Sequence, residues 1–73
     1  MTSMHEPLRP SWLCGGCGNE WPCPRRREEL AAESEGSAVS LALTMAEYLE
    51  DALADHPQAP ATVLYTRFLG WLR

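Results

Sequence analysis

Apolar residues recur every three or four positions over residues 38–55, which places them on one face of a helix. These residues are Ala38, Leu41, Ala42, Met45, Leu49, Ala52 and Leu53, and Tyr48 lies beside them. Ser37 precedes this stripe and is a typical N-cap residue. The opposite face is acidic and is expected to contact water through Glu47, Glu50, Asp51 and Asp55. The pattern predicts an amphipathic helix from about Ala38 to Asp55.

Two further helices are predicted on either side of this one. Pro24 suits a first helical position, where its missing N–H is no loss, the residues up to 33 are mostly good helix formers, and Gly36 marks the stop. Prolines keep the connection 56–60 out of a helix, and an apolar segment over residues 60–72 predicts the third helix. Because the connection is short, the second and third helices should pack as an antiparallel pair.

The first 23 residues follow neither a helical nor an alternating period. They are rich in Pro, Gly and Cys, which indicates loops and tight turns rather than a regular element. The sequence therefore predicts a single domain over residues 1–73, with a metal-binding loop over 1–23 and a helical part over 24–73. The expected fold class is a small α-helical domain of about three helices with an N-terminal irregular, zinc-bound loop resembling a zinc knuckle.

The small size of the chain favours a fold that is stabilised by a bound metal ion. A domain near 73 residues buries only about 60% of the surface that its unfolded chain exposes. Chains below roughly 70–80 residues commonly add a disulfide, a metal or a partner to reach sufficient stability.

All three cysteines lie in the stretch WLCGGCGNEWPC, as a C-x-x-C pair (Cys14 and Cys17) followed by Cys23. An odd number of cysteines cannot all pair within one chain, and in a reducing compartment clustered cysteines are more often metal-binding than disulfide-bonded. Three cysteines with one histidine are a common structural zinc set. We therefore expect one Zn²⁺ per chain.

The fourth ligand has two protein candidates, with water or a ligand from a partner as the remaining option. His5 lies nine residues before Cys14 in the same irregular segment, whereas His56 lies at the far end of the second helix. The closed coordination of structural zinc sites favours His5. A thiolate at Cys23 would also be favoured by the N-terminus of the helix that begins at Pro24.

Other interpretations of the cysteines stay open. C-G-G-C after a Trp loosely resembles a redox dithiol, but that motif works within a βαβ unit, and an iron–sulfur cluster usually takes four cysteines. Glu20 could act as the base of a catalytic zinc, although a solvated carboxylate is the simpler interpretation. No Ser/His/Asp order, P-loop or paired-carboxylate arrangement is recognisable, so no catalytic residue is assigned.

Several residues outside the ligand set are candidates for contacting a partner. Arg25, Arg26 and Arg27 could contact phosphates, or pair with neighbouring acids and offset a negatively charged metal centre. Trp12 and Trp21 could form a stacking platform, or cover the metal centre as core. At the end of the chain, Phe68 and Trp71 are either core residues or part of a protein-binding face.

Composition narrows the class of partner. The net charge of −4, without any lysine, argues against non-specific nucleic-acid binding. The start of the chain lacks a basic segment followed by an apolar run, so no secretory signal is expected. No stretch approaches the roughly 20 apolar residues of a membrane span. We expect a soluble cytoplasmic protein that is a monomer or a weak homo-oligomer.

One resemblance covers nearly the whole chain. Its pattern is His5, Arg9-Pro10-Ser11-Trp12-x-Cys14-x-x-Cys17-Gly18-x-x-Trp21-Pro22-Cys23, Arg26, Leu30 and Tyr65-x-Arg67-Phe68-Leu69-Gly70-Trp71. The chain thereby resembles a family of short actinobacterial Cys-rich proteins, often catalogued as "flavin reductase" or as uncharacterised. The resemblance supports His5 as a ligand and implies an accessory role in natural-product biosynthesis.

The leading functional hypothesis is a zinc-stabilised binding or adaptor module with a protein partner. A nucleic-acid-binding zinc module is the first alternative, and a redox or flavin-linked accessory enzyme is the second. No G-x-G-x-x-G dinucleotide fingerprint opens a helix in this chain.

Overall fold

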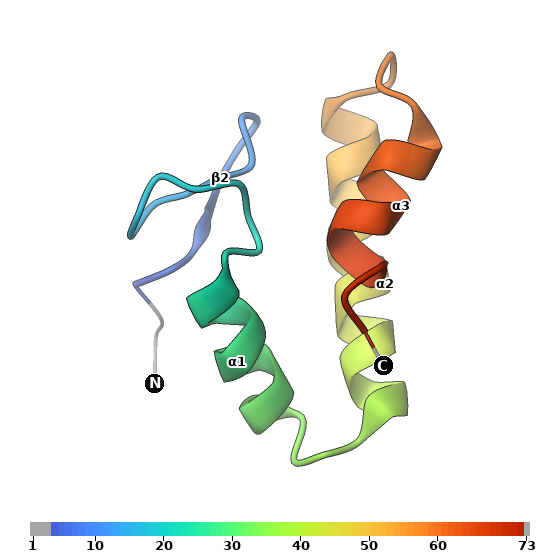
Figure 1. Ribbon diagram of the computed structural model, residues 1–73. Coiled ribbons are helices and arrows are strands. Elements are labelled where there is room, and N and C mark those ends of the chain that lie inside the picture. Colours follow the sequence, from blue (N-terminus) through green and yellow to red (C-terminus); the bar gives the residue numbers. More distant parts are fainter. Residues whose placement is uncertain (1–3, 73) are drawn as a thin grey trace.

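The computed structural model describes residues 4–72. Within them, three helices follow two very short strands, and Figure 1 shows the strand-bearing segment above α1, beside the pair formed by α2 and α3. In chain order the elements are β1 (Pro7–Leu8), β2 (Leu13–Cys14), α1 (Pro24–Glu33), α2 (Ala38–Asp55) and α3 (Ala61–Leu69). The predicted class, a small helical domain with an N-terminal His/Cys cluster able to hold a metal, is confirmed.

The start of α1 and both ends of α2 follow signals in the sequence, whereas α1 ends at Glu33, before the predicted stop at Gly36. The Ser37 hydroxyl accepts a hydrogen bond of 3.2 Å from the Ser40 amide and so caps α2. Between the two helices Gly36 has a φ of +80°, a conformation that residues with a Cβ rarely adopt. The predicted start of α1 at Pro24 and both ends of α2 are confirmed.

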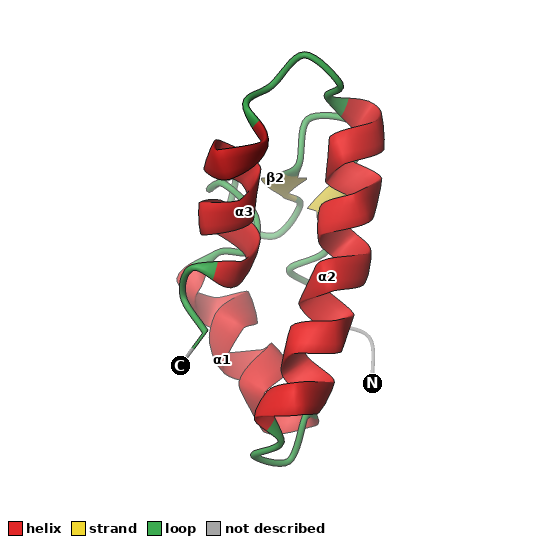
Figure 2. Ribbon diagram, turned by 90° about the vertical axis from the view of Figure 1, so that its right-hand side faces the viewer, coloured by secondary structure: helices red, strands yellow, loops and turns green. Residues whose placement is uncertain are grey.

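The shorter helix α3 packs against α2. The chain rises along α2, reverses through residues 56–60 and descends along α3, as Figure 2 shows. The predicted antiparallel pair is therefore confirmed. The third helix is shorter than predicted, because it ends at Leu69 with Gly70 as its C-cap rather than continuing to Leu72. Glycine is a poor helix former, and the following Leu72 amide closes a turn on the Leu69 carbonyl at 3.1 Å.

The expectation that residues 1–23 contain no regular element is wrong in one detail. Pro7 pairs with Cys14 and Leu8 with Leu13 in an antiparallel ladder, and Leu13 forms an isolated bridge with Glu20. Strands of two residues are too short to produce a readable alternation of polar and apolar positions. The ladder holds the His5 segment beside the C-x-x-C turn.

Aromatic rings join the N-terminal segment to the helix pair. Trp12 and Phe68 lie 5.4 Å apart between ring centroids, and Trp21 lies 4.6 Å from Tyr48, both in edge-on arrangements. Such pairs favour this geometry because the positive edge of one ring meets the negative face of the other. The other residues of the buried core are Cys14, Cys23, Leu30, Met45, Ala52 and Leu64.

One set of polar contacts that attaches the N-terminal segment to the helix pair involves Arg67 of α3. Its Nε donates to the Trp21 carbonyl at 2.7 Å, and its Nη2 donates to the Trp12 carbonyl. Glu20 lies 3.5 Å from Nη1. The guanidinium fork therefore connects α3 to the backbone on both sides of the C-x-x-C turn.

A second set of such contacts lies at the end of α2. Arg9 donates two hydrogen bonds of 2.8 and 2.9 Å to the Asp55 carboxylate, which also accepts one of 2.8 Å from the Trp12 indole. The Arg9 guanidinium is the main reason that the pKa of Asp55 is lowered to about 2. Asp55 was expected to face water, but its side chain is only 16% exposed. The other three acids of that face, Glu47, Glu50 and Asp51, are exposed as predicted.

Within residues 4–72, no helix combines the length and the apolar character needed to cross a membrane.

Candidate metal centre

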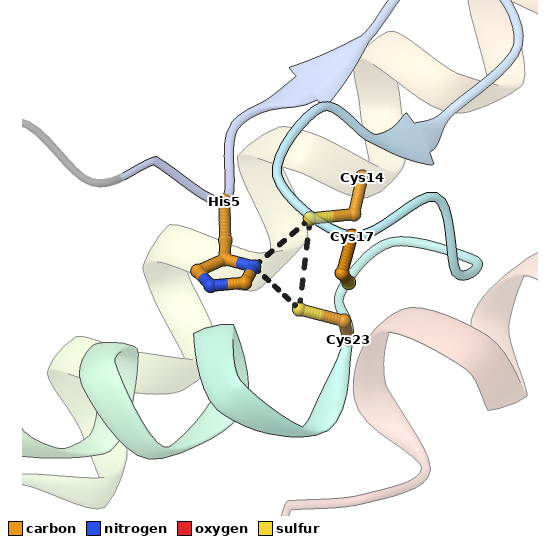
Figure 3. Close-up of side chains that lie close together, drawn as sticks. All are labelled: His5, Cys14, Cys17 and Cys23. Carbon is orange, nitrogen blue, oxygen red and sulfur yellow. Dashed lines mark hydrogen bonds between the residues drawn. The ribbon is translucent and has the colours of Figure 1, made fainter.

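The side chains of one histidine and three cysteines converge beside the start of α1. Figure 3 shows the side chains of His5, Cys14 and Cys23 turned toward one another, with Cys17 beside them. Their ligand atoms all lie within 4.8 Å of one another. All three cysteines are free thiols, so no disulfide competes with metal binding in this state.

The distances within the cluster match those of a tetrahedral metal site. The His5 Nδ1 atom lies 3.2 Å from the Cys14 sulfur and 3.4 Å from the Cys23 sulfur, and these two sulfurs are 3.7 Å apart. A tetrahedral zinc ion, with bonds of about 2.3 Å to sulfur and about 2.0 Å to nitrogen, would separate two sulfurs by about 3.8 Å and a sulfur from the nitrogen by about 3.5 Å. Three of the four donors therefore have the spacing of a tetrahedral site, and the Cys17 sulfur lies within 4.8 Å of each of them.

A tight backbone turn brings the C-x-x-C pair together. The Gly18 amide donates to the Cys14 carbonyl at 2.8 Å, and the Cys14 amide donates to the Asn19 carbonyl at 2.7 Å. A Cβ on Gly16 would lie 2.7 Å from the Met4 carbonyl oxygen and 3.0 Å from the His5 Nδ1 atom. The absent side chain at Gly16 therefore lets the His5 segment approach the sulfurs.

Polar hydrogens from the same turn point at the sulfurs. The Gly16 amide lies 3.4 Å from the Cys14 sulfur, and the Asn19 side-chain amide lies 3.4 Å from the Cys17 sulfur. Donors of this kind orient ligands and stabilise negative charge on them. Burial raises the pKa of Cys14, but the Gly16 amide and His5 outweigh it, so the net pKa is lowered. The Asn19 backbone amide is the main cause of the lowered pKa of Cys17.

Cys23 occupies the N-cap position of α1, directly before Pro24. The helix N-terminus was expected to favour its thiolate. Burial instead raises the pKa of Cys23, and the Arg26 amide in the first turn offsets only part of that effect. A bound cation reverses this preference, because coordination deprotonates a thiol outright.

The two histidines have separate roles. His5 lies in the cluster, and its segment is held by a 2.8 Å hydrogen bond from the Trp21 indole to the His5 carbonyl. His56 is the C-cap of α2 and its Nε2 lies 2.5 Å from the Pro10 carbonyl oxygen. His56 is outside the cluster, so the structure brings together the ligand set that contains His5.

The aromatic candidates for partner contact lie mostly inside the protein. Trp12 is 1% exposed, and Trp21 and Phe68 are 0% exposed. None of the three therefore offers a face on which a base or a partner could stack. Their burial follows from the small size of the chain, because three large rings supply much of the apolar volume available to its core.

The three consecutive arginines point to different environments instead of forming one basic face. Arg25 is exposed and lies 3.9 and 3.7 Å from Glu28 and Glu29. Arg26 is buried and pairs with Glu33 at 2.7 Å. Arg27 donates to the Pro22 carbonyl at 3.0 Å. The run therefore serves local pairing and helix packing.

Trp71, the remaining candidate, is half-buried beyond the end of α3. The Arg27 guanidinium lies 5.7 Å from the centroid of its ring. The ring also borders a surface pocket of about 430 Å³, whose apolar wall includes Ala31, Leu41 and Leu72. This is the part of the predicted partner-binding set that the structure leaves next to an open apolar surface.

Sequence reasoning did not assign a role to two residues that position the site. Gly16 is only one residue of the predicted glycine-rich loop in the sequence, although its lack of a Cβ is what lets the His5 segment approach. Arg67 appeared only within the resemblance pattern. Its signal was an isolated cation on an otherwise uncharged helix, a residue type that is seldom buried without a partner.

The chain matches no family model, and neither a curated protein nor a solved structure matches it. Three sulfurs and one imidazole nitrogen form a soft, nitrogen-containing set, which suits Zn²⁺ and not the oxygen-preferring Mg²⁺ or Ca²⁺.

Proposed function

We propose that this protein holds one structural Zn²⁺ ion through His5, Cys14, Cys17 and Cys23. The observation that supports this proposal most directly is that the distances among the donor atoms of His5, Cys14 and Cys23 are close to the edges of a zinc-centred tetrahedron. The Cys17 sulfur lies within 4.8 Å of these three atoms. Three cysteines are one short of the usual complement of an iron–sulfur cluster. Four protein donors also close the coordination sphere, which is typical of structural rather than catalytic zinc.

Zinc would act chiefly as a folding element of the N-terminal segment. Residues 4–23 contain only four residues in strands, and none in a helix. Structural zinc in finger peptides contributes an apparent 10–16 kcal/mol, roughly, at neutral pH. Binding of this size would offset the entropy of ordering the loop, and the loop in turn supplies Trp12 and Trp21 to the shared core.

The metal assignment is tested by elemental analysis of the purified protein together with a count of reactive thiols. We expect one zinc per chain and three thiols that react much faster after a chelator is added. His56→Ala should retain zinc like the wild type, whereas His5→Ala should bind it more weakly. Protein purified without metal, with two cysteines reversibly oxidised, would favour the redox dithiol instead.

We further propose that the zinc-stabilised domain is a binding or adaptor module for a protein partner. Large apolar side chains are exposed on both helices of the pair, including Val39 and Leu43 on α2 and Val63 and Tyr65 on α3. Contiguous apolar patches mark interaction sites, and Val39 and Leu43 lie one turn apart on the same face of α2. The resemblance to short actinobacterial proteins supports an accessory role in natural-product biosynthesis.

The adaptor role is tested by affinity purification from a host that expresses the protein. A specific partner should be recovered with the wild type and lost with the double variant Val39→Ser, Leu43→Ser, while the zinc content of the two proteins stays equal. Equal recovery with both proteins would remove the support for a partner surface on α2. Loss of a biosynthetic product on deletion of the gene would support the accessory role.

A further inference from the structure

The four proposed ligands differ in their access to solvent. Cys14 and Cys23 are 2% and 1% exposed, and His5 is half-buried. Cys17 is exposed and lies at the surface of the C-x-x-C turn. A reagent in solution can therefore reach one thiolate of the centre directly, while the other two are covered by protein.

The neighbours of the three cysteines differ in rigidity. Cys23 lies between Pro22 and Pro24 at the start of α1, where both rings restrict the backbone. Cys14 and Cys17 are separated by Gly15 and Gly16, which carry no side chain. A change in sulfur position is therefore accommodated more easily within the C-x-x-C turn than at Cys23.

Building on the proposed zinc site, we propose that Cys17 is a peroxide-modified residue whose oxidation releases the metal. The Cys17 thiolate attacks one peroxide oxygen, the O–O bond breaks, and sulfenic acid and hydroxide form. The Cys14 thiolate then displaces hydroxide from the Cys17 sulfur and forms the disulfide. Two thiolates lose two electrons in total, the peroxide becomes two hydroxide ions, and Zn²⁺ leaves a centre that retains only His5 and Cys23.

The consequence for the fold follows from the position of the centre. The oxidised turn no longer draws the His5 segment toward the start of α1, so the packing of Trp21, whose indole donates to the His5 carbonyl, is weakened. The oxidised and zinc-bound forms therefore differ in the surroundings of that tryptophan. A thiol reductant with added zinc restores the original state, because sulfenic acid and disulfide are both reversible products.

The experiment uses the full-length, zinc-loaded protein and hydrogen peroxide. Zinc release is followed with a chromogenic chelator, and the remaining thiols are then alkylated under denaturing conditions. Cleavage after Glu20 separates the peptide that contains Cys14 and Cys17 from the one that contains Cys23. We expect one zinc released per disulfide, a first peptide lighter by two hydrogens, and a second peptide that is fully alkylated.

Two variants sharpen the test. Cys17→Ser should slow peroxide-driven release by at least about tenfold, because the covered thiolates then have to react first. Met4→Leu removes an exposed methionine, which peroxide also oxidises, and should leave the release rate unchanged. Because Cys17→Ser also removes a ligand, alkylation of the zinc-loaded wild type provides an independent measurement, and Cys17 should be labelled before Cys14 and Cys23.

The results separate this inference from the proposal on which it rests. Protein that takes up no zinc overturns both. Zinc-loaded protein that keeps its metal under peroxide, forms a disulfide through Cys23, or alkylates Cys23 first overturns only the role of Cys17.

Discussion

Replacing Arg67 with Met tests how the N-terminal segment is attached to the helix pair. The substitution removes the hydrogen bonds to the Trp12 and Trp21 carbonyls but retains an apolar side chain along α3. The Arg67 side chain is 18% exposed, so these bonds are shielded from water. Among the described residues, the Trp21 carbonyl loses its hydrogen-bond donor, while the Trp12 carbonyl keeps the Trp21 amide at 3.0 Å.

The expected magnitude follows from these contacts. A hydrogen bond to a charged group contributes about 1.5–3 kcal/mol, and one of the two acceptors keeps a second donor. The ion pair with Glu20 adds little, because that carboxylate is 77% exposed. We expect a loss of about 3 kcal/mol in the free energy of unfolding. Arg67→Lys should fall between wild type and Arg67→Met, because an ammonium keeps the charge but lacks the fork.

The assay is urea unfolding at saturating zinc, followed by tryptophan fluorescence. Arg25→Met is the matched control, because it removes the same charge from a side chain that is 68% exposed and makes only long ion pairs of 3.7 and 3.9 Å. That control should change stability by no more than about 0.5 kcal/mol. Equal stability of Arg67→Met and Arg25→Met would refute the role of Arg67 in attaching the N-terminal segment.

Three further outcomes follow from the structure. Gly16→Ala should weaken zinc binding at least about tenfold in a chelator competition, because its Cβ would clash with the Met4 carbonyl. Gly15→Ala, for which the nearest contacts of an added Cβ are 3.3 Å, should weaken zinc binding less. The reverse order of the two variants would contradict the account. The pKa of Asp55 is lowered from 3.8 to about 2, so its ion pair with Arg9 stabilises the fold above pH 4 and loses this contribution as pH falls toward 2. The stability of Asp55→Asn should therefore fall less steeply in an acid titration than that of the wild type. Parallel stability curves would argue against the ion pair. Removal of zinc by a chelator should unfold the N-terminal segment, so the circular dichroism and the tryptophan fluorescence should change when one equivalent of zinc is removed. Unchanged spectra would show that the metal is not a folding element.

The helical part of the fold was readable from local signals. Pro24 and Ser37 mark helix starts through backbone and side-chain geometry that depends on neighbouring residues only. The apolar stripe of α2 likewise needs no knowledge of its partner. The end of α3 was less readable, because whether a helix continues past Gly70 depends on how the last apolar residues pack.

The grouping of the four donors could be predicted because three of them lie within ten positions. The choice of His5 over His56 needed only the coordination number and the distance along the sequence, and the structure brings His5 to the cysteines. The polar contacts that attach the N-terminal segment to the helix pair were not predictable in the same way. Arg9 meets Asp55, and Arg67 meets Trp21, across 46 positions of the sequence in each case, and no local pattern records such contacts.

The burial of the tryptophans shows why a pattern near a metal site is ambiguous. Two rings that flank a cysteine cluster can serve a ligand or the core equally well in sequence terms. In this fold the Trp12 ring packs against Phe68 and the Trp21 ring packs against Tyr48. The Arg67 guanidinium, which binds the Trp21 carbonyl, holds this segment in place. Burial of apolar area decides the outcome, because a chain of this size has few other large side chains to bury.

X-ray absorption at the zinc edge of the purified protein, combined with its metal content, tests the central claim most directly. We expect one zinc per chain, coordinated by three sulfurs at about 2.3 Å and one nitrogen at about 2.0–2.1 Å. His5→Ala should replace the nitrogen with a different light atom or lose the metal, while His56→Ala should leave the spectrum unchanged. Protein without bound metal, or a first shell with two sulfurs or fewer, would contradict the account.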